Sequence, residues 1–326
     1  MIEGFTPHSE ALLPRLLAVR RIGVPLLRGD PGLLVVSHFA LYTAPLLAAL
    51  ADHPLVIHFQ GPWGLEGAAE RQSGLTVLAK TAVERMVYRR ATAFIVLSTP
   101  FGRILEKRFG IAPEKIHVIP GGVDVARFNV AESRTECRAR LGWPADRPIV
   151  LAVRRLTRRM GLDDLVGAVA KIRESVPNVL VLIAGRGPIA PELEQQIHAL
   201  GLADNVRLLG YVPDDDLPCA YRAADLTIVP TIALEGFGLI VAESFAAGTP
   251  CLVTPVGGLP EAASGLSPSL VLGGTGSAAI AAGVTAALTG ALPMPTAAAC
   301  LDFARRNYDW SVIAERTRLV YEEAVR

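Results

Sequence analysis

The segment from Glu235 to Glu243, EGFGLIVAE, combines two carboxylates with two glycines. It follows the apolar run 226–229 and is expected to open a helix, whose first N–H groups have no partner within the helix. These N–H groups and the helix dipole favour a phosphate, and Gly236 and Gly238 let the backbone approach it closely. The carboxylates would lie about 12 Å apart along the helix and contact different parts of an elongated ligand. The alternative is a helix packed through its glycines, with one carboxylate in solvent.

A second group that could bind an anion is the turn RRLTRRMG at 154–161, which directly follows the apolar run 149–153. Guanidiniums at the carboxyl end of a strand suit a diphosphate. Each close arginine–phosphate pair is worth ~4 kcal/mol at the effective dielectric of a protein surface, before desolvation is counted. A basic turn in solvent explains the same residues equally well.

Two further motifs resemble ligand sites more weakly. Residues 185–190, GRGPIA, imitate a dinucleotide-binding turn, but Pro188 restricts the second glycine and the turn does not open its domain. Asp214–Asp216 contains a D-x-D that could hold Mg²⁺, but the flanking prolines favour an acidic helix N-cap, and no metal site is expected. The histidines lack the partners for nucleophilic catalysis, and only His38 and His58 fall near strand ends.

The composition argues against several classes of protein. With 32 Lys and Arg against 31 Asp and Glu, the net charge of +1 does not indicate nucleic acid as the main partner. Four widely spaced cysteines argue against a zinc site or a disulfide scaffold and suit a reducing cytoplasm. The first 20 residues, which include Glu3, His8 and Glu10, contain no apolar signal segment. The uncharged stretches 32–51 and 262–301 are interrupted by polar residues, Gly or Pro and are not expected to span a membrane.

Short apolar runs alternate with segments of helical period, which predicts α/β domains with parallel sheets buried on both faces and ligands at the carboxyl ends of the strands. The expected strands are 33–37, 55–59, 93–97, 116–120, 149–153, 179–184, 206–209, 226–229, 251–254 and 270–272. The length suits two domains, with a boundary in the polar stretch 128–146. The leucines and arginines before residue 30 predict an amphipathic helix.

Taken in order, these motifs resemble the retaining glycosyltransferases of family 4, which have the GT-B fold of two Rossmann-like, doubly wound parallel-sheet domains facing a cleft. The resemblance rests on IHVIPGGVD at 116–124, Arg155-Leu156 with Gly161, AGRGP at 184–188, LGYV at 209–212, Pro230 with 235–243, Gly257-Gly258, and Trp310 with Tyr321. It implies an N-terminal acceptor-side domain over 1–128, a C-terminal nucleotide-sugar domain over 129–308 and a returning C-terminal helix over 309–326.

The resemblance also implies roles for individual residues. Glu243 would accept hydrogen bonds from the donor's ribose, and Glu235 would contact the donor sugar. Arg155, with Arg159, would balance the charge on the departing diphosphate, so we expect a nucleotide-diphosphate sugar as donor substrate and no cofactor. The other expected donor-binding residues are Gly185 and Gly187, with Tyr211 and Val212 near the base. The amides of Gly236, Phe237, Gly238 and Leu239 are expected near the sugar or phosphate.

The sequence departs from the family pattern in three places. Met160 stands where the family has a lysine, so that charge would come from Arg158 or Arg159 or be absent. Gln60 stands where the family often has a histidine; it can hydrogen-bond but cannot take a proton, and His58 would share its side of the strand and is the second candidate there. The family's opening strand and glycine-rich loop, roughly 50 residues, have no counterpart, so the first domain is expected to be incomplete, through a misplaced start or a true shortening.

The leading prediction is a metal-independent retaining glycosyltransferase acting on a glycan, lipid or small-molecule acceptor. A degenerate, non-catalytic partner subunit and a nucleotide-sugar epimerase are the alternatives. The protein is expected in the cytoplasm. Arg15, Arg20, Arg21, Arg28 and the segment 80–90 could dock on an anionic membrane, at ~1 kcal/mol per basic residue, or form ordinary exposed helices.

Overall fold

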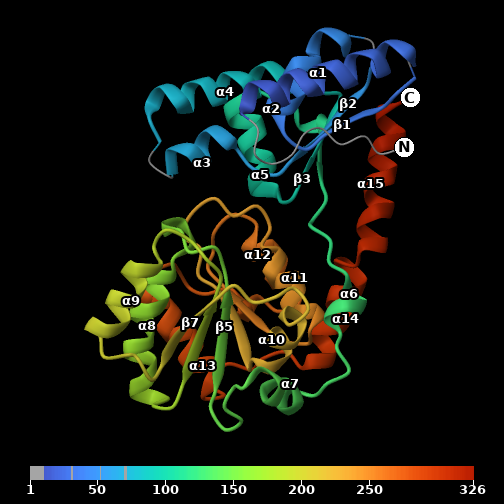
Figure 1. Ribbon diagram of the computed structural model, residues 1–326. Coiled ribbons are helices and arrows are strands. Elements are labelled where there is room, and N and C mark those ends of the chain that lie inside the picture. The colour runs from blue at the N-terminus through green and yellow to red at the C-terminus, as the bar shows by residue number, and fades with distance from the viewer. Residues whose placement is uncertain (1–10, 31, 52, 70–71) are drawn as a thin grey trace. The chain divides into compact units, whose positions relative to one another are not determined.

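The computed structural model describes residues 11–30, 32–51, 53–69 and 72–326, and the chain divides into two compact units (Figure 1). Unit 1 comprises residues 1–119 and 315–326, and unit 2 comprises residues 120–314. Glu3, His8 and Glu10, which entered the signal-segment argument, lie outside the described residues.

The described residues of unit 1 form a four-stranded parallel sheet in the order β1-β2-β3-β4. Its strands are β1 (Val35–Ser37), β2 (Leu55–Phe59), β3 (Ala93–Val96) and β4 (Ile116–Val118). In β2 and β3 nearly every side chain is buried, as expected for a parallel sheet with both faces covered. Because the strands are parallel, their carboxyl ends all lie at one edge of the sheet.

Helices and short turns cover this sheet. They are α1 (Leu12–Gly29), α2 (Ala40–Thr43), η1 (Ala44–Ala49), α3 (Trp63–Ala69), α4 (Gly74–Tyr88), α5 (Thr99–Ile104), η2 (Leu105–Phe109), η3 (Pro113–Lys115) and the end of α15 (Trp310–Ala324). Between sheet and helices, the ring of Phe59 lies edge-on to those of Tyr88 and Phe101, with centroids 5.9 and 5.8 Å apart. This aromatic core fixes the end of β2, where the polar residues of unit 1 gather.

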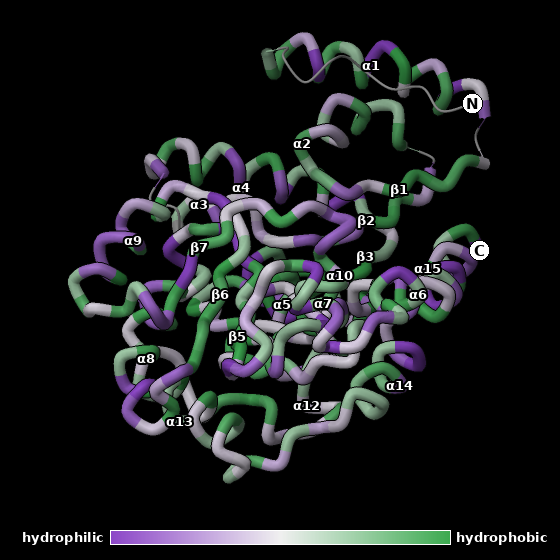
Figure 2. Tube along the Cα trace, turned by 60° about the horizontal axis from the view of Figure 1, so that its bottom comes forward, coloured by the Kyte–Doolittle hydropathy of each residue, from purple (hydrophilic) through white to green (hydrophobic). Residues whose placement is uncertain are grey.

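The described residues of unit 2 form a five-stranded parallel sheet in the order β7-β6-β5-β8-β9. Its strands are β5 (Ile149–Val153), β6 (Leu180–Ala184), β7 (Val206–Gly210), β8 (Leu226–Val229) and β9 (Cys251–Val253). In Figure 2, β5 and β6 are coloured as hydrophobic, and all the side chains of β6 are buried. The strand order places β8 directly beside β5, and this neighbourhood positions the site described below.

The helices and turns of unit 2 are α6 (Val125–Phe128), α7 (Arg134–Leu141), η4 (Arg158–Met160), α8 (Leu162–Ser175), α9 (Ala190–Ala199), α10 (Leu217–Ala223), α11 (Leu239–Ala246), α12 (Leu259–Ser264), η5 (Pro268–Leu270), α13 (Ser277–Leu288), α14 (Ala297–Asn307) and the start of α15. No helix in the described ranges is both long and apolar enough to cross a membrane.

The structure differs from the sequence-based expectation at one strand. The run 270–272 makes only a single bridge, from Val271 to Val253. The 3₁₀ turn Pro268–Leu270 takes up the first residue of this run, and Gly273 follows it at once, so no ladder extends from the bridge. Each of the other expected runs overlaps a strand, and the helix expected before residue 30 is α1.

The first unit ends at Ile119, whereas the sequence analysis places the end of the first domain at residue 128. Residues 120–128 belong to unit 2 because they are bonded to it. The N–H of Val123 donates to the carbonyl of Tyr308 at 2.8 Å, and α6 packs against α11. The polar composition used to place the boundary therefore reflects the exposed helix α7, which begins in a capping box at Ser133.

Candidate functional site

In the parallel sheet of unit 2, the order in which strands are added reverses at β5. The chain places β6 and β7 on one side of β5 and then returns to place β8 and β9 on the other side. In open α/β sheets, ligands bind at the carboxyl ends of the strands beside such a switch point. Arg154 directly follows β5, and Thr231 and Glu235 follow β8. The topology therefore brings these three side chains together.

Arg154 and Glu235 form an ion pair in which the side chains are only 6% and 15% exposed. Nη2 of Arg154 donates to a carboxylate oxygen of Glu235 and to the hydroxyl of Thr231, the latter at 2.5 Å. The Thr231 hydroxyl in turn donates to the same carboxylate oxygen at 3.2 Å. A buried ion pair needs such additional hydrogen bonds, because the attraction alone does not offset the desolvation of both charges.

The main chain of Glu235 is also held in place. The N–H of Gly258 donates to its carbonyl at 2.9 Å. Gly257 has a φ of +57°, and a Cβ there would lie 2.0 Å from the same carbonyl oxygen. Both features of Gly257 exclude a side chain, which explains the glycine at this position.

Glu235 does not lie in the helix that the spacing predicted. Helix α11 begins only at Leu239, after Gly238 with a φ of +83°, and Leu234 has a φ of +54°. The expected two-turn separation of Glu235 and Glu243 along one helix is therefore wrong. The positive φ at Leu234 and Gly238 turns the chain, and Glu235 lies in the loop between them.

Glu243 lies in α11 and is mostly buried. The hydroxyl of the fully buried Tyr221 donates to its Oε2 at 2.6 Å. Burial raises the pKa of Glu243 above the ordinary value, and the hydrogen bond from Tyr221 opposes this only in part. One carboxylate oxygen thus has a fixed partner inside the unit.

The expected glycine-rich contact surface is partly a packing surface. Phe237 is 3% exposed, and its ring lies edge-on to that of Tyr308 with centroids 5.1 Å apart. Gly236 and Gly238 are buried, whereas Leu239 is 49% exposed. Only main-chain atoms of Phe237 could reach a ligand.

Close packing also explains why residues 185 and 187 are glycines. A Cβ on Gly185 (φ +138°) would lie 1.9 Å from the carbonyl oxygen of Arg154, and one on Gly187 would lie 2.2 Å from that of Leu156. The N–H of Leu156 donates to the carbonyl of Arg186 at 2.9 Å. This turn therefore supports the chain that carries Arg154.

The expected base-side residues lie after β7. Tyr211 is 56% exposed, and the guanidinium of Arg186 lies over its ring at 5.5 Å. Val212 is half-buried. Tyr211 therefore presents an open aromatic face at the carboxyl edge of the sheet.

The arginines after β5 differ in their surroundings. Arg155 is exposed, and Arg158 forms an exposed ion pair with Glu192 at 2.8 Å. Nη1 of Arg159 donates to the carbonyl of Leu234 at 3.0 Å, which holds the strained residue before Glu235. The buried arginine is Arg154, to which the sequence analysis gave no role of its own.

Arg154 could have been found from the sequence. Ala152, Arg154 and Leu156 are buried while Arg155 is exposed, so the two-residue period of β5 continues past its end. Thr231 carried no comparable signal, since its partner Arg154 comes from a distant part of the chain.

In unit 1, His58 lies in β2, with its Nε2 2.7 Å from the hydroxyl of Tyr321 in α15. The ring of His38 stacks on it, with centroids 4.4 Å apart. Burial, and then the neighbouring His38, lower the pKa of His58 to about 4. Gln60 follows the end of β2 and is exposed. Tyr321 was not predicted as a neighbour of this site.

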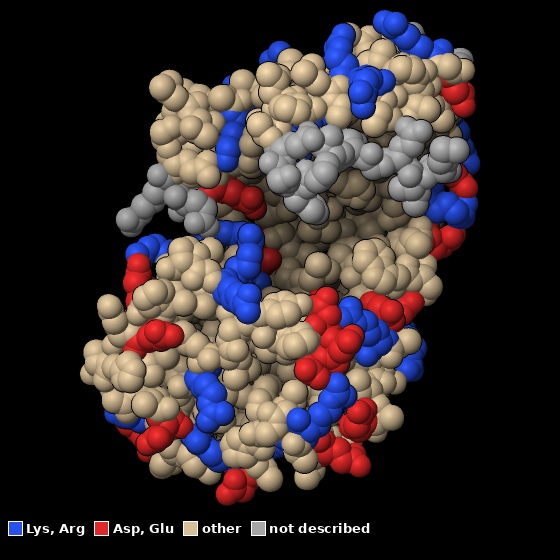
Figure 3. Space-filling view, viewed as in Figure 1, with Lys and Arg blue, Asp and Glu red and all other residues tan. Residues whose placement is uncertain are grey.

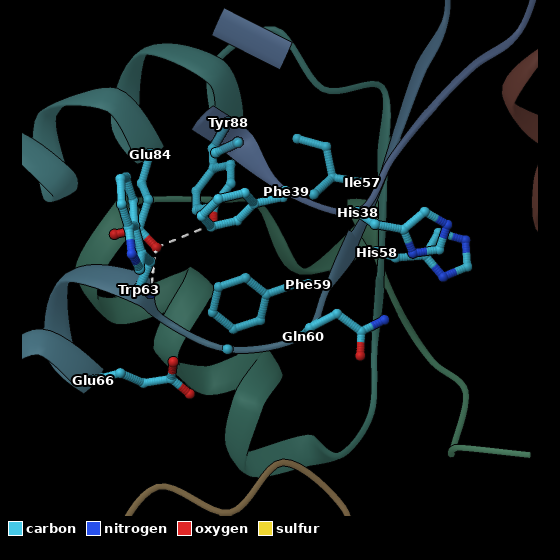
Figure 4. Close-up of a pocket in the computed structure, with 12 residues that line it drawn as sticks. His38, Phe39, Ile57, His58, Phe59, Gln60, Trp63, Glu66, Glu84 and Tyr88 are labelled. Atoms are coloured by element: carbon cyan, nitrogen blue, oxygen red, sulfur yellow. Dashed lines mark hydrogen bonds between the residues drawn. The ribbon is translucent and has the colours of Figure 1, made fainter. Parts of the chain in front are cut away.

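A cavity of about 180 Å³ opens at this end of the unit 1 sheet (Figure 4). Its lining includes Phe39, Gln60, Trp63 and Glu66, and the rings of Phe39 and Trp63 lie edge to face, with centroids 5.0 Å apart. At its base the buried Glu84 accepts hydrogen bonds from the N–H groups of Trp63 and Gly64 at 2.8 and 3.2 Å. Burial nevertheless raises the pKa of Glu84.

Asp216 takes the predicted position before α10, but its carboxylate does not cap the helix. It pairs with Arg140 at 2.8 Å instead. Within the described ranges, no three His, Cys, Asp or Glu side chains gather as a metal site. The four cysteines are buried and free.

Two family models match the chain. The one described as "Glycosyl transferases group 1" matches residues 133–305, just over half of the chain, and "Glycosyltransferase Family 4" matches residues 3–127. Among curated relatives, the D-inositol 3-phosphate glycosyltransferase of Streptomyces scabiei is 33% identical over 76% of this chain and 57% of its own length. The 2-deoxystreptamine glucosyltransferase of Streptomyces kanamyceticus is 32% identical over 59% of this chain and 50% of its own. The chain thus spans about half the length of the curated relatives it matches.

Solved structures show the same fold. HepE from Anabaena, in complex with UDP, superposes with a TM-score of 0.77 at 22% identity, covering 95% of this chain and 83% of HepE. Sucrose-phosphate synthase from Thermosynechococcus elongatus gives a TM-score of 0.79 at 24% identity, covering 98% and 80%. These matches confirm the resemblance that the motifs indicated and the expected pair of parallel-sheet α/β domains. The chain therefore belongs to the glycosyl transferases group 1 family, with an N-terminal part of glycosyltransferase family 4 and the GT-B fold.

Proposed function

We propose that this protein is a retaining, metal-independent glycosyltransferase that moves a sugar from a nucleoside diphosphate sugar to an acceptor hydroxyl. The observation that carries the proposal is the buried cluster of Arg154, Thr231 and Glu235 at the switch point of unit 2. Support comes from HepE, whose structures are described as complexes with UDP and with UDP-glucose.

Unit 2 binds the donor in this proposal. Glu243 accepts hydrogen bonds from the ribose through the carboxylate oxygen that Tyr221 does not use, and the exposed ring of Tyr211 lies against the base. Glu235 contacts the sugar, and the main-chain N–H groups before α11 face the phosphates. Arg155 and Arg159 supply further positive charge, which takes the place of a metal ion.

The reaction forms a bond from the acceptor's oxygen to the anomeric carbon of the sugar. The bond from that carbon to the diphosphate breaks, and the diphosphate leaves with the electron pair and accepts the hydroxyl proton. Fixed guanidiniums stabilise the charge that develops on the leaving group, and losing one such preorganised donor costs about 10²–10³ in rate.

Calorimetric titration with UDP and GDP tests the proposal first. Saturable binding of one of them is expected, followed by acceptor-dependent release of that nucleotide from a panel of donor sugars, with unchanged rate in EDTA and a retained anomeric configuration by NMR. Failure to bind either nucleotide contradicts the proposal. Binding without turnover points to a non-catalytic partner subunit, and a changed donor sugar without acceptor points to an epimerase.

The acceptor binds in the cavity of unit 1. The rings of Phe39 and Trp63 offer apolar faces, and Gln60 and Glu66 offer hydrogen-bonding groups, which together suit a ring that carries several hydroxyls. In Figure 4 the rings of Phe39 and Phe59 lie between Trp63 and Gln60. Glu66→Gln is expected to raise the KM for the acceptor and leave donor binding unchanged, whereas the exposed Glu114→Gln should alter neither.

Unit 1 also contacts an anionic membrane through α1. Leu13 and Leu17 of this helix are 66% and 58% exposed, Arg20 and Arg21 are exposed beside them, and α1 contains no acidic residue. Figure 2 shows α1 with hydrophobic and hydrophilic residues interspersed, and Figure 3 shows basic side chains over this part of unit 1. Exposed leucines beside arginines suit a surface that is both apolar and anionic.

Sedimentation with vesicles tests the membrane contact. The protein should pellet with vesicles that contain phosphatidylglycerol and stay in the supernatant with pure phosphatidylcholine. A Leu13→Ser, Leu17→Ser variant should lose binding, whereas Leu319→Ser, at a leucine of α15 that is 53% exposed, should not. Equal pelleting of both variants would show that α1 is not the contact.

A further inference from the structure

Arg154 is a buried cation whose hydrogen bonds are incomplete. Its side chain is 6% exposed, and the bonds it makes to protein oxygens, on Thr231 and Glu235, both come from Nη2. Its Nε is buried and has no hydrogen-bond partner among the described residues. An arginine carries five N–H donors, and a buried donor without a partner is costly, so such groups are normally satisfied.

The position of this guanidinium is fixed from several sides. The N–H of Arg154 donates to the carbonyl of Ala184 at 2.8 Å, and Gly185 packs against its own carbonyl. Nη2 lies 2.8 Å from the sulfur of Met160, the last residue of the 3₁₀ turn η4. The charge therefore stands at the switch point of the sheet, where strand order alone predicts a ligand.

From the sequence, the positive charge beside Met160 was expected to come from Arg158 or Arg159, or to be absent. Arg158 is exposed and paired with Glu192, and Arg159 bonds the carbonyl of Leu234. The side chain that reaches Met160 is instead that of Arg154, from the end of β5. A desolvated cation attracts an anion far more strongly than a surface cation does, because the effective dielectric around it is lower.

We propose that Arg154 binds the diphosphate of the donor directly, through donors that Glu235 does not use, while Nη2 holds Glu235 beside the sugar. The inference rests on the proposed function and adds to it a residue that links anion binding to the placement of the carboxylate. A ligand oxygen completes the hydrogen bonds of the guanidinium, including that of Nε. The competing explanation is a purely structural ion pair between β5 and the loop after β8.

The first experiment compares Arg154→Gln with Arg158→Gln, an arginine of the same turn that is exposed. Each protein is titrated calorimetrically with UDP, GDP, inorganic pyrophosphate and uridine. We expect Arg154→Gln to weaken the binding of UDP, GDP and pyrophosphate by about tenfold or more, the scale of one lost hydrogen bond to a charged group. The affinity for uridine should not change. The control variant should stay within about twofold of the wild type, as an exposed charge contributes little.

A second variant covers the case in which Arg154→Gln does not fold, because Glu235 loses its partner. Since the sulfur of Met160 lies 2.8 Å from Nη2, a lysine at 160 can place its ammonium in the same region. The double variant Arg154→Gln, Met160→Lys should therefore regain thermal stability and most of the affinity for pyrophosphate. A structural role alone predicts recovered stability without recovered affinity, and that result would overturn the inference.

The outcomes separate this inference from the function on which it rests. If the wild type binds UDP or GDP and a folded Arg154→Gln protein binds it equally well, the role of Arg154 is refuted and the proposed function stands. An equal loss of uridine affinity also refutes a contact to the diphosphate. If the wild type binds neither nucleotide, the proposed function itself fails, and this inference fails with it.

Discussion

The hydroxyl of Tyr321 and Nε2 of His58 lie 2.7 Å apart and share a hydrogen bond, although 263 residues separate them in the chain. Tyr321 belongs to the last turns of α15, so this bond attaches the C-terminal helix to β2 within unit 1. His58 also stacks on His38 and is partly withdrawn from water, which keeps it neutral at physiological pH.

Unit 1 is expected to lose stability as the pH falls from about 6.5 to about 4. The pKa of His58 drops on folding from 6.5 to about 4, so between these values the unfolded chain binds the proton and the folded chain does not. Thermal unfolding of wild type and His58→Asn measures this. Between pH 7 and pH 5, the melting temperature of the variant should fall by less than that of the wild type. If the melting temperatures of both proteins fall equally with pH, the prediction is wrong.

Tyr321→Phe removes one hydrogen bond and retains the ring. It should lower the free energy of unfolding by about 0.5–1.5 kcal/mol, the net worth of a typical hydrogen bond. Chemical denaturation at pH 7.5 measures the change. The comparison variant is Trp310→Phe, at a residue that lies in the same helix but belongs to unit 2. A Tyr321→Phe protein as stable as the wild type would show that the bond does not hold α15.

Glu243→Gln is expected to stabilise the protein at neutral pH and weaken nucleotide binding. The raised pKa of Glu243 means that the folded state disfavours its charged form, so its contribution to stability falls as the pH rises through that pKa. The gain in melting temperature should be present at pH 7.5 and shrink at pH 4. UDP or GDP affinity should fall about tenfold. Glu194→Gln, an exposed glutamate of α9, should change neither quantity.

Phe237→Ala should cost about 3–5 kcal/mol of stability, because it removes a buried ring from the contact with Tyr308. Leu239→Ala, two residues later and half exposed, should cost about 1 kcal/mol. Urea denaturation of both variants provides the comparison. Equal costs would mean that Phe237 is not part of the core.

Gly185→Ala should destabilise unit 2 by about 2 kcal/mol or more, since the added Cβ meets the carbonyl of Arg154 and the backbone is strained for an L residue. Gly273→Ala, where a Cβ meets nothing within 4 Å, should stay within about 0.5 kcal/mol. If both substitutions are tolerated alike, the support that Gly185 gives to the end of β5 is not needed for folding.

Much of the fold could be predicted because buried parallel strands leave a clear pattern. The limits of β2, β5 and β8 agree with their apolar runs, since both faces of these strands are covered. The expected strand 270–272 failed because composition alone does not show whether neighbours leave room for a ladder. The division at Ile119 differs from the predicted domain end at residue 128 because long-range bonds, such as that of Val123 to Tyr308, tie residues 120–128 to unit 2.

The sequence predicted which chain segments form the candidate site better than it predicted which side chains do. Glycines, arginines and acids mark the loops after β5 and β8, but spacing cannot tell which arginine points inward. Arg154 is buried and Arg155 is exposed, and only the strand period extended by one residue separates them. The partners Thr231 and Tyr321 come from distant chain segments, so tertiary structure alone brings them to Arg154 and His58.

The two sheets differ in how they make room for a ligand. In unit 2 the opening follows from strand order, since β5 and β8 are neighbours whose connections leave in opposite directions. In unit 1 the described strands succeed one another in chain order, and the cavity is lined by residues of β2 and α4 and by residues in and around α2 and α3. Substitutions in and around α2 and α3 would reshape the cavity without changing the strand order of the sheet. Under the proposed function, the acceptor site of unit 1 could therefore change in evolution while the donor site of unit 2 stays the same.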